Sequence, residues 1–275
     1  MITKKILITG GYSGIGLELS KILFNEGHKI GLIIKNENRK LEFLREYPEF
    51  NTLEIDIFLA DLSNQEQIIQ VANDIRNRWG KIDILFNNAG VLLGEKLLSA
   101  QGNEMHFEIN TLAHYLLTLK LKPLLQESGG AIVINTATDG LHYIKTIDIQ
   151  DLFNPKKFKK LFGSYTQSKL ALVLLMNKIS DEWFKNNIRI INVSPGGNKT
   201  KLTEGKGMPA WMTPLMVLLY KNPIHGAKLL YGAAFNESYK DKTGIYLQNG
   251  KIQKIKLSLN EVQESEILKR YKISF

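Results

Sequence analysis

Short runs of apolar residues alternate along the chain with longer segments in which apolar residues recur at helical spacing. The short runs are rich in Ile, Leu and Val, and they occupy residues 5–9, 29–34, 53–60, 82–87, 131–135, 188–193 and 244–247. Their nearly continuous apolar character indicates strands that are buried on both faces, and the intervals leave room for crossover helices. The pattern predicts an α/β fold with a doubly wound parallel sheet.

The domain organisation follows from length and from the spacing of these runs. The 275 residues suit one large α/β domain, and we see no internal repeat or long linker, so we expect a single domain over residues 1–275. Two stretches, 139–162 and 200–223, exceed ordinary strand-to-helix connections. Because ligands bind at the carboxyl edge of parallel sheets, we expect both stretches to form substrate-pocket insertions.

Charge narrows the class of partner. The net charge is +9, but 36 Lys and Arg are scattered among 27 acidic residues, which is typical of a solvated surface and argues against nucleic acid as a partner. A local exception is "NPKKFKKLFG", where lysines at 156–160 surround Phe158. This segment is either an element that binds an anionic substrate or a membrane surface, or a solvated basic helix face over core aromatics.

Composition also bears on metals and on the membrane. The chain has no Cys, and its five His show no close ligand spacing, so we expect no metal site. No apolar run is long enough to span a bilayer and no signal peptide is evident, so we expect no integral membrane segment and a cytoplasmic location.

Residues 5–27 have the pattern of a strand, a glycine-rich turn and a helix. Gly10, Gly14 and Gly16 lie in the turn, and Gly27 closes the helix. Glycines here allow a sharp turn and close approach of a pyrophosphate, whose charge is attracted by the N-H groups at the helix start. We therefore predict a dinucleotide-binding loop.

The spacing in "TGGYSGIG" resembles the short-chain dehydrogenase/reductase family, which has a Rossmann-type fold. Three more motifs of that family follow in the family order: "ADLS" at 60–63, "NNAG" at 87–90 and "SPGGNKT" at 194–200. The resemblance implies a nicotinamide cofactor bound by Gly10, Tyr12, Ser13, Gly14, Ile15, Gly16, Asp61, Leu62, Asn88, Ala89, Gly90, Pro195, Gly196 and Thr200. Two local alternatives stay open: Asp61 serves only the next helix, beside a Ser63 and Glu66 capping box, and Asn87 only satisfies sheet backbone.

"GSYTQSKL" places Tyr165 and Lys169 one helical turn apart, between the fifth and sixth strands, where the family keeps Tyr-x-x-x-Lys. An ordinary Tyr, with a pKa of ~10, is a poor acid-base group at neutral pH, and we expect the Lys169 ammonium to lower the pKa of Tyr165. The resemblance implies that Tyr165 is the acid-base group, that both residues contact the cofactor, and that Asn110 holds a relay water. Alternatively, Asn110 is a helix-interior residue bonded to backbone.

The third catalytic residue of the family is a Ser that holds the substrate carbonyl, and "AIVINTATDG" contains none. Matching "VINTAT" to the family pattern puts Thr138 at that position. Its hydroxyl can donate the same hydrogen bond, although the β-branch restricts χ1. A shift of one residue would put Ala137 there and would undermine catalysis.

The residues after the second strand bear on the cofactor. Ile34 occupies the position where an NAD site usually offers an acid, and Lys35, Arg39 and Lys40 follow it. We predict that Lys35 helps to bind NADP and that NADP is preferred over NAD. The alternative is that these cations are solvated residues at a turn.

Within the family, the sequence is most similar to the retinol dehydrogenase and WW-domain oxidoreductase branch, which implies an apolar carbonyl or alcohol substrate. The function predicted is hydride transfer between a nicotinamide cofactor and a ketone, aldehyde or secondary alcohol. The missing Ser keeps one alternative open: a catalytically impaired dinucleotide-binding regulator or scaffold. The resemblance also implies a homodimer or homotetramer, although some members are monomers.

Overall fold

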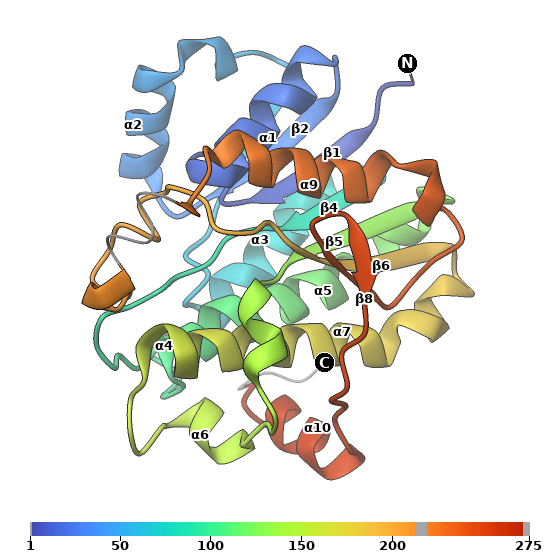
Figure 1. The fold of residues 1–275 in the computed structure, drawn as a ribbon. Coiled ribbons are helices and arrows are strands. Elements are labelled where there is room, and N and C mark those ends of the chain that lie inside the picture. Colours follow the sequence, from blue (N-terminus) through green and yellow to red (C-terminus); the bar gives the residue numbers. More distant parts are fainter. Residues whose placement is uncertain (1, 213–218, 272–275) are drawn as a thin grey trace.

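One sheet forms the centre of the molecule in the computed structural model, which describes residues 2–212 and 219–271 (Figure 1). Its strand order is β3-β2-β1-β4-β5-β6-β7-β8. The parallel strands are β1 (Lys5–Thr9), β2 (Lys29–Ile34), β3 (Ile55–Leu59), β4 (Ile84–Asn87), β5 (Ala131–Thr136), β6 (Ile188–Ser194) and β7 (Ile245–Gln248). Each corresponds to a predicted apolar run, which confirms the doubly wound α/β fold.

The strand β8 (Lys251–Gln253) was not predicted, and it pairs antiparallel with β7. The two strands are joined at Asn249 and Gly250, whose φ angles are 49° and 72°. Two consecutive residues with positive φ are typical of a tight hairpin turn, for which Asn-Gly is the preferred sequence. The Asn-Gly pair was therefore the signal that could have revealed β8.

Helices cover both faces of the sheet (Figure 1). One face carries α1 (Gly14–Asn25), α2 (Glu37–Glu46) and α9 (Pro223–Phe235), and the other carries α3 (Gln65–Arg78), α5 (His114–Gln126) and α7 (Thr166–Phe184). The shorter helices α4 (Met105–Phe107), α6 (Ile149–Phe153) and α10 (Glu261–Leu268) lie on the second side. No helix among the described residues is long and apolar enough to cross a membrane.

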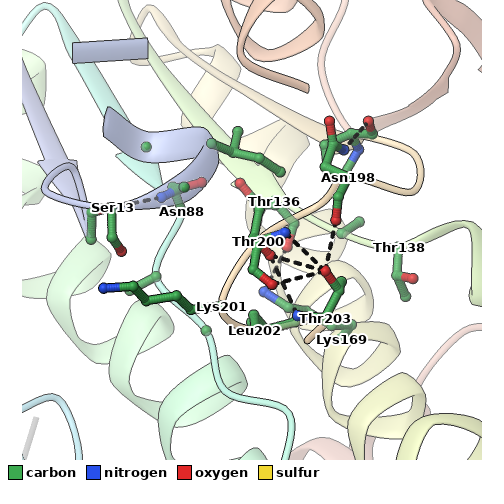
Figure 2. Close-up of a pocket in the computed structure, with 18 of the residues that line it drawn as sticks. Ser13, Asn88, Thr136, Thr138, Lys169, Asn198, Thr200, Lys201, Leu202 and Thr203 are labelled. Atoms are coloured by element: carbon green, nitrogen blue, oxygen red, sulfur yellow. Dashed lines mark hydrogen bonds between the residues drawn. The ribbon is translucent and has the colours of Figure 1, made fainter. Parts of the chain in front are cut away.

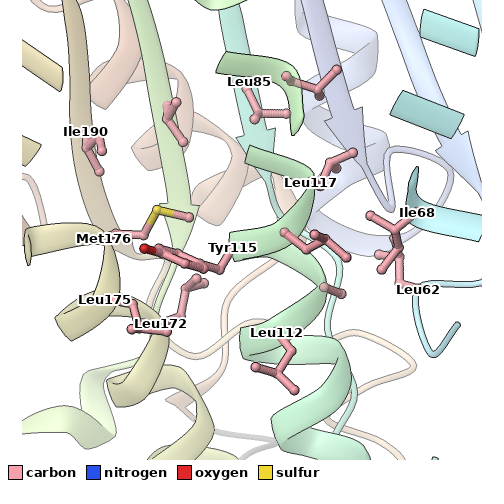
Figure 3. Packing of buried hydrophobic residues seen from close by; sticks show 14 of the residues in the cluster. Leu62, Ile68, Leu85, Leu112, Tyr115, Leu117, Leu172, Leu175, Met176 and Ile190 are labelled. Carbon is pink, nitrogen blue, oxygen red and sulfur yellow. The ribbon is translucent and has the colours of Figure 1, made fainter. Parts of the chain in front are cut away.

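Each face of the sheet has its own apolar core. On the α5 and α7 side, Tyr115 and Met176 pack in one cluster with Ile190 of β6 and Leu85 of β4 (Figure 3). These side chains are almost completely buried. The crossover helices are therefore amphipathic in the sense that the sequence pattern predicted.

The order of the strands opens a crevice at one edge of the sheet. The chain leaves β1 toward β2 but continues from β4 toward β5, so the loops at the carboxyl ends of β1 and β4 diverge. Just below this edge, Asn87, Asn135 and Asn192 lie in register, with side-chain hydrogen bonds of 2.9 and 3.0 Å between neighbours. Asn87 Nδ2 therefore donates to the side chains of Asn135 in β5 and Thr118, and among the described residues the Asn87 side chain has no hydrogen bond to sheet backbone.

The two irregular stretches contain little regular structure. Residues 139–162 include a 3-10 turn (Asp139–Tyr143), α6, and the start of a π-helical turn (Lys160–Tyr165). The lysines at 156, 157 and 159 lie in bent, non-helical chain, so the interpretation as a basic helix face is wrong, although Phe158 does stack on the buried ring of His106 at 5.8 Å. Residues 213–218 of the second stretch lie outside the described residues.

Candidate active site

A cleft of about 220 Å³ opens at the carboxyl edge of the sheet (Figure 2). Most of the predicted cofactor and catalytic residues line it: Gly10, Tyr12, Ser13, Gly14, Ile15, Gly16, Asn88, Ala89, Gly90, Thr138, Tyr165, Lys169, Pro195, Gly196 and Thr200. Sequence reasoning did not assign Thr136, Asn198, Lys201, Leu202 and Thr203, which also line it. Ala137, considered only as the alternative to Thr138, is a further lining residue. The first five can be traced to their motifs. Apart from Thr136, these lie within or directly after "SPGGNKT", so continuing that motif by three residues would have found them. Four predicted residues, Lys35, Asp61, Leu62 and Asn110, lie outside the lining.

The glycine turn at the start of α1 is shaped by close backbone contacts. Gly10 and Gly14 have φ angles of 65° and 53°, a region that favours glycine. A Cβ added to Gly16 would lie 2.2 Å from the Gly10 carbonyl oxygen and 2.5 Å from Asn88 Nδ2. Ser13, the N-cap residue of α1, makes no capping hydrogen bond with its side chain. The backbone N-H groups at this helix start are therefore available to an anion.

The ends of β1 and β4 are joined through Thr9. Its hydroxyl oxygen accepts hydrogen bonds from the backbone N-H groups of Asn88 at 2.9 Å and Ala89 at 3.0 Å. The side chain of Asn88 in turn donates to the Thr9 carbonyl oxygen at 3.1 Å. The "NNAG" segment thus holds the glycine turn in place.

Tyr165 and Lys169 are both buried, and burial controls their protonation. Lys169 Nζ donates a hydrogen bond to the carbonyl oxygen of Thr136 at 2.8 Å, and burial lowers the pKa of Lys169 to about 7. Burial raises the pKa of Tyr165 to about 12, with a further rise from Tyr220 and an opposing hydrogen bond with Thr138. The predicted lowering of this pKa is wrong for the isolated chain, because the phenolate is removed from water and the ammonium of Lys169 is itself disfavoured by burial.

Thr138 lies beside Tyr165, as the match to the family pattern predicted. Its side chain is hydrogen-bonded to the Tyr165 side chain, and its backbone carbonyl accepts a hydrogen bond from Tyr246 Oη at 3.0 Å. The neighbouring Ala137 is buried, and its backbone N-H donates to the Val193 carbonyl oxygen at 2.8 Å. Both Ala137 and Thr138 line the cleft, and of the two only Thr138 offers a side-chain hydroxyl to the phenol.

Thr136 has an unpaired polar atom in the cleft wall. Its side chain is 7% exposed, and its hydroxyl has no hydrogen-bond partner among the described residues. A buried hydroxyl without a partner is unfavourable in an isolated chain. The cleft is therefore suited to a ligand with a polar group at this point.

Asn110 is held behind the cleft, in a π-helical turn (Glu108–Ala113) that precedes α5. Its amide accepts from the backbone N-H of Val91 at 2.9 Å and donates to the Val91 carbonyl oxygen at 3.1 Å. A third bond, of 3.1 Å, reaches Ser168 Oγ. The alternative of a backbone-bonded helix residue describes this side chain well, yet its contact with Ser168 ties it to the helix turn that carries Lys169.

The predicted adenosine side of the site contains an ion pair. Lys35 Nζ lies 3.1 Å from Asp61 Oδ2, and Asp61 Oδ1 accepts from the backbone N-H and hydroxyl of Ser63 at 2.9 and 2.7 Å. Burial opposes ionisation of Asp61, but these bonds and Lys35 together lower its pKa. Burial raises the pKa of Tyr12, which lines the cleft, and the positive charges of Arg39 and Lys35 partly oppose that rise.

Two details of this region differ from expectation. The N-cap of α3 is Asn64, whose side chain accepts from the backbone N-H groups of Glu66 and Gln67, so Ser63 forms no capping box with Glu66. Ser63 is used instead by Asp61. The side chain of Leu62 belongs to the core cluster under α3 and contributes no surface to the cleft.

A second, apolar cavity of about 560 Å³ adjoins the cleft. Both irregular stretches contribute to it, and Leu92 and Met208 pack against the ring of Tyr165. The two spaces share Thr138, Tyr165, Gly196, Leu202 and Thr203. The remaining lining residues are Asp139, Gly140, Tyr143, Leu161, Phe162, Thr166, Gly197, Met212 and Tyr220. A small molecule in this cavity would touch Tyr165, which also lines the cleft.

Solved structures resemble the chain over most of its length. An NADPH-bound carbonyl reductase from chicken fatty liver superposes with a TM-score of 0.70 at 21% identity, covering 92% of this chain and 99% of that one. A 3-ketoacyl-(acyl-carrier-protein) reductase from Brucella melitensis complexed with NADH gives a TM-score of 0.68 at 21% identity, covering 90% and 97%. At this level of identity the likeness shows the shared fold.

Sequence comparison identifies the family. The family model described as short chain dehydrogenase matches residues 4–147. Retinol dehydrogenase 11 of Mus musculus is 27% identical, with 90% of this chain and 78% of that protein covered. The chloroplastic short-chain dehydrogenase TIC 32 A of Brassica napus is 32% identical, with 87% and 78% covered. The chain therefore belongs to the short-chain dehydrogenase/reductase family of oxidoreductases.

Proposed function

We propose that this chain is an NADP-dependent oxidoreductase that transfers a hydride between the cofactor and an apolar ketone, aldehyde or secondary alcohol, with Tyr165 as the acid-base group. The observation that carries the proposal is the position of Tyr165 in the wall common to the cleft and the apolar cavity. A carbonyl group in the cavity would meet the phenol at the same point where the cofactor cleft begins.

The cleft suits a nicotinamide dinucleotide. The N-H groups at the start of α1 would bind the diphosphate, because they lie at the positive end of the helix dipole and the glycine turn leaves room for close approach. The unpaired hydroxyl of Thr136 offers a hydrogen bond farther along the cleft. The cofactor, when bound, supplies or accepts the hydride.

The chain's own groups handle the substrate oxygen and its proton. In the reductive direction, the hydroxyl of Thr138 donates a hydrogen bond to the substrate oxygen, and Tyr165 gives that oxygen its proton as the carbon receives the hydride. A pKa of about 12 keeps Tyr165 protonated, which is the state that donation requires. Lys169, with a pKa of about 7, exchanges protons near neutrality and would also bind the ribose hydroxyls. In the oxidative direction, Tyr165 would have to accept the proton as the phenolate, a state that the raised pKa of Tyr165 disfavours, so the geometry favours reduction.

The apolar cavity supports an apolar substrate. Leu92, Leu161, Met208 and Met212 line it, and the two stretches proposed as substrate-pocket insertions supply most of its surface. Relatives are named for retinol and for polyprenol, including a polyprenol dehydrogenase of Danio rerio that is 27% identical with 90% of this chain covered. Burial of apolar area would provide most of the affinity for such a substrate.

Steady-state turnover tests this proposal. The purified chain is mixed with NADPH or NADH and a panel of apolar and polar carbonyl compounds, and oxidation of the cofactor is followed. We expect turnover with apolar carbonyls and faster rates with NADPH. Tight cofactor binding without turnover on any compound would reject the enzyme and support the alternative of a dinucleotide-binding regulator or scaffold.

The preference for NADP is supported by the cations after β2. Ile34 is completely buried in the core, so the first side chain that β2 can offer to a ribose is Lys35. Lys35 is paired with Asp61, and Arg39 is paired with Glu42 at 2.6 Å. A 2′-phosphate would draw the ammonium of Lys35 away from Asp61 or share it, and a charge-assisted bond of this kind contributes roughly 1.5 to 3 kcal/mol.

Titration with both reduced cofactors tests whether Lys35 is the residue that selects NADP over NAD. Because Lys35 is 55% exposed and already paired, we expect Lys35→Ala to weaken NADPH by about tenfold, the lower end of that range, and to leave NADH nearly unchanged. Lys40→Ala, which removes a cation paired with Glu37 on the same helix, is the matched control. Equal losses for the two cofactors, or no loss, would remove Lys35 as the selector.

A further inference from the structure

Lys201 is a cation in the cofactor cleft to which neither motif nor fold assigns a role. It follows Thr200, its side chain is exposed, and it lines the cleft together with Ser13 and Gly14. Among the residues that the structure describes, no carboxylate lies within ion-pair distance of its ammonium. Lys35 differs because its charge is already paired, and Lys169 differs because it is buried and loses its proton near neutrality.

The segment that carries Lys201 is held against the glycine turn. The methyl carbon of Thr200 lies 3.2 Å from where a Cβ of Gly14 would be. The hydroxyl of Thr203 donates to the Asn198 carbonyl oxygen at 2.8 Å and accepts from the Thr200 backbone N-H at 3.0 Å, which closes the turn on both sides of Lys201. Figure 2 shows the Lys201 side chain extending toward Ser13 and away from Thr138.

We propose that Lys201 binds the diphosphate of the dinucleotide from the side opposite to the helix start. The inference rests on the proposed function only in that a nicotinamide dinucleotide occupies the cleft. The first N-H groups of α1 would neutralise the diphosphate partly, and the ammonium of Lys201 supplies a full positive charge facing them. The unpaired hydroxyl of Thr136 in the same cleft is an independent sign of a polar ligand there.

The position of Lys201 also links the cofactor to the substrate cavity. Leu202 and Thr203, the next two residues, line both spaces, and Met208 lines the apolar cavity. A bond between Lys201 and the diphosphate therefore anchors the chain segment that forms one wall of the cavity. Cofactor binding should restrain this wall before the substrate enters.

The test compares Lys201→Gln with Lys199→Gln, which removes an exposed lysine two residues earlier that does not line the cleft. Dissociation constants are measured by fluorescence titration for NADPH and NADH, and by displacement for adenosine 5′-diphosphate. Because the diphosphate is common to all three, Lys201→Gln should weaken each by a similar factor of about ten, and Lys199→Gln should weaken none.

Three results would overturn the proposal: equal affinities in the two variants, a loss restricted to NADPH, or an unchanged affinity for adenosine 5′-diphosphate. A wild-type chain that binds none of the three nucleotides would instead reject the proposed function.

Hydrogen exchange gives a readout independent of affinity. Saturating NADPH should slow exchange of the amides at 201–208 in wild type and Lys199→Gln but not in Lys201→Gln, and equal protection in all three would contradict the link to the cavity.

Discussion

The cofactor cleft and the apolar cavity share a wall but are built in different ways. The cleft consists mainly of short turns that directly follow β1, β4, β5 and β6, and hydrogen bonds such as those of Thr9 to Asn88 and Ala89 fix its backbone. The cavity is lined mainly by side chains from two long segments with little regular structure, and Leu92 adds a further apolar side chain. Under the proposed function, cofactor recognition would thus be largely a property of local backbone, whereas substrate recognition would depend on how distant segments pack.

The cleft and the apolar cavity meet at the wall that they share. Tyr165 and Thr138 belong to both spaces, while Lys169 lines only the cleft and Met208 only the cavity. Substitutions at these four positions should therefore separate effects on protonation, chemistry and substrate affinity.

The largest effect is expected from the buried amine of Lys169. Its pKa of about 7 lies below its ordinary value of 10.5, so between these pH values the unfolded chain binds a proton that the folded chain does not, and stability rises with pH. Lys169→Met has no amine that must lose its proton on folding. The stability of this variant relative to wild type should therefore grow by about 1.4 kcal/mol per pH unit as pH falls from 10 to 7.

Urea unfolding of both proteins at several pH values measures this difference. Lys178→Met, on the same helix and partly exposed in an ion pair with Glu264, is the control and should show no such slope. A pH-independent difference between Lys169→Met and wild type would show that the amine is not buried in its neutral form.

The next largest effect is expected at the phenol in the shared wall. Tyr165→Phe keeps the ring and its packing against Leu92 and Met208 but removes the transferable proton. Turnover should fall by at least about 10²-fold, while the dissociation constant for NADPH stays nearly constant. Tyr143→Phe, at an exposed position that lines only the cavity, should turn over almost normally. Near-normal turnover by Tyr165→Phe would exclude Tyr165 as the acid-base group.

Thr138 should show a smaller effect that depends on its hydroxyl. Thr138→Ser keeps the donor and should retain activity, whereas Thr138→Val keeps the shape and should lose at least about tenfold in kcat. Both variants should bind NADPH with similar affinity. Equal rates for the two would mean that the hydroxyl does not contact the substrate oxygen in the transition state.

The smallest effect is expected in the cavity alone. Met208→Ala removes apolar surface beside Tyr165, so KM for an apolar carbonyl should rise by about three- to tenfold, with NADPH affinity unchanged. Parallel losses of both affinities in Met208→Ala would mean that the two spaces are not separable.

The sequence itself determined the sheet and most of the cofactor cleft. Strand burial and glycine spacing are local properties, so apolar runs located β1 to β7, and Gly10, Gly14 and Gly16 located the turn before α1. Family resemblance then added Thr138, Tyr165 and Lys169, because motifs at strand ends meet at one edge of a parallel sheet. Even β8 had a local signal in Asn249 and Gly250.

Only the tertiary structure decided the charges and the cavity. Lys169 was expected to lower the pKa of Tyr165, but burial raises it, and burial depends on what the whole fold places around a side chain. Likewise, the pairing of Lys35 with Asp61 and the approach of Lys201 to the glycine turn join residues far apart in the chain. Local pattern encodes backbone conformation, whereas desolvation, ion pairing and cavity shape arise from long-range packing that no short stretch contains.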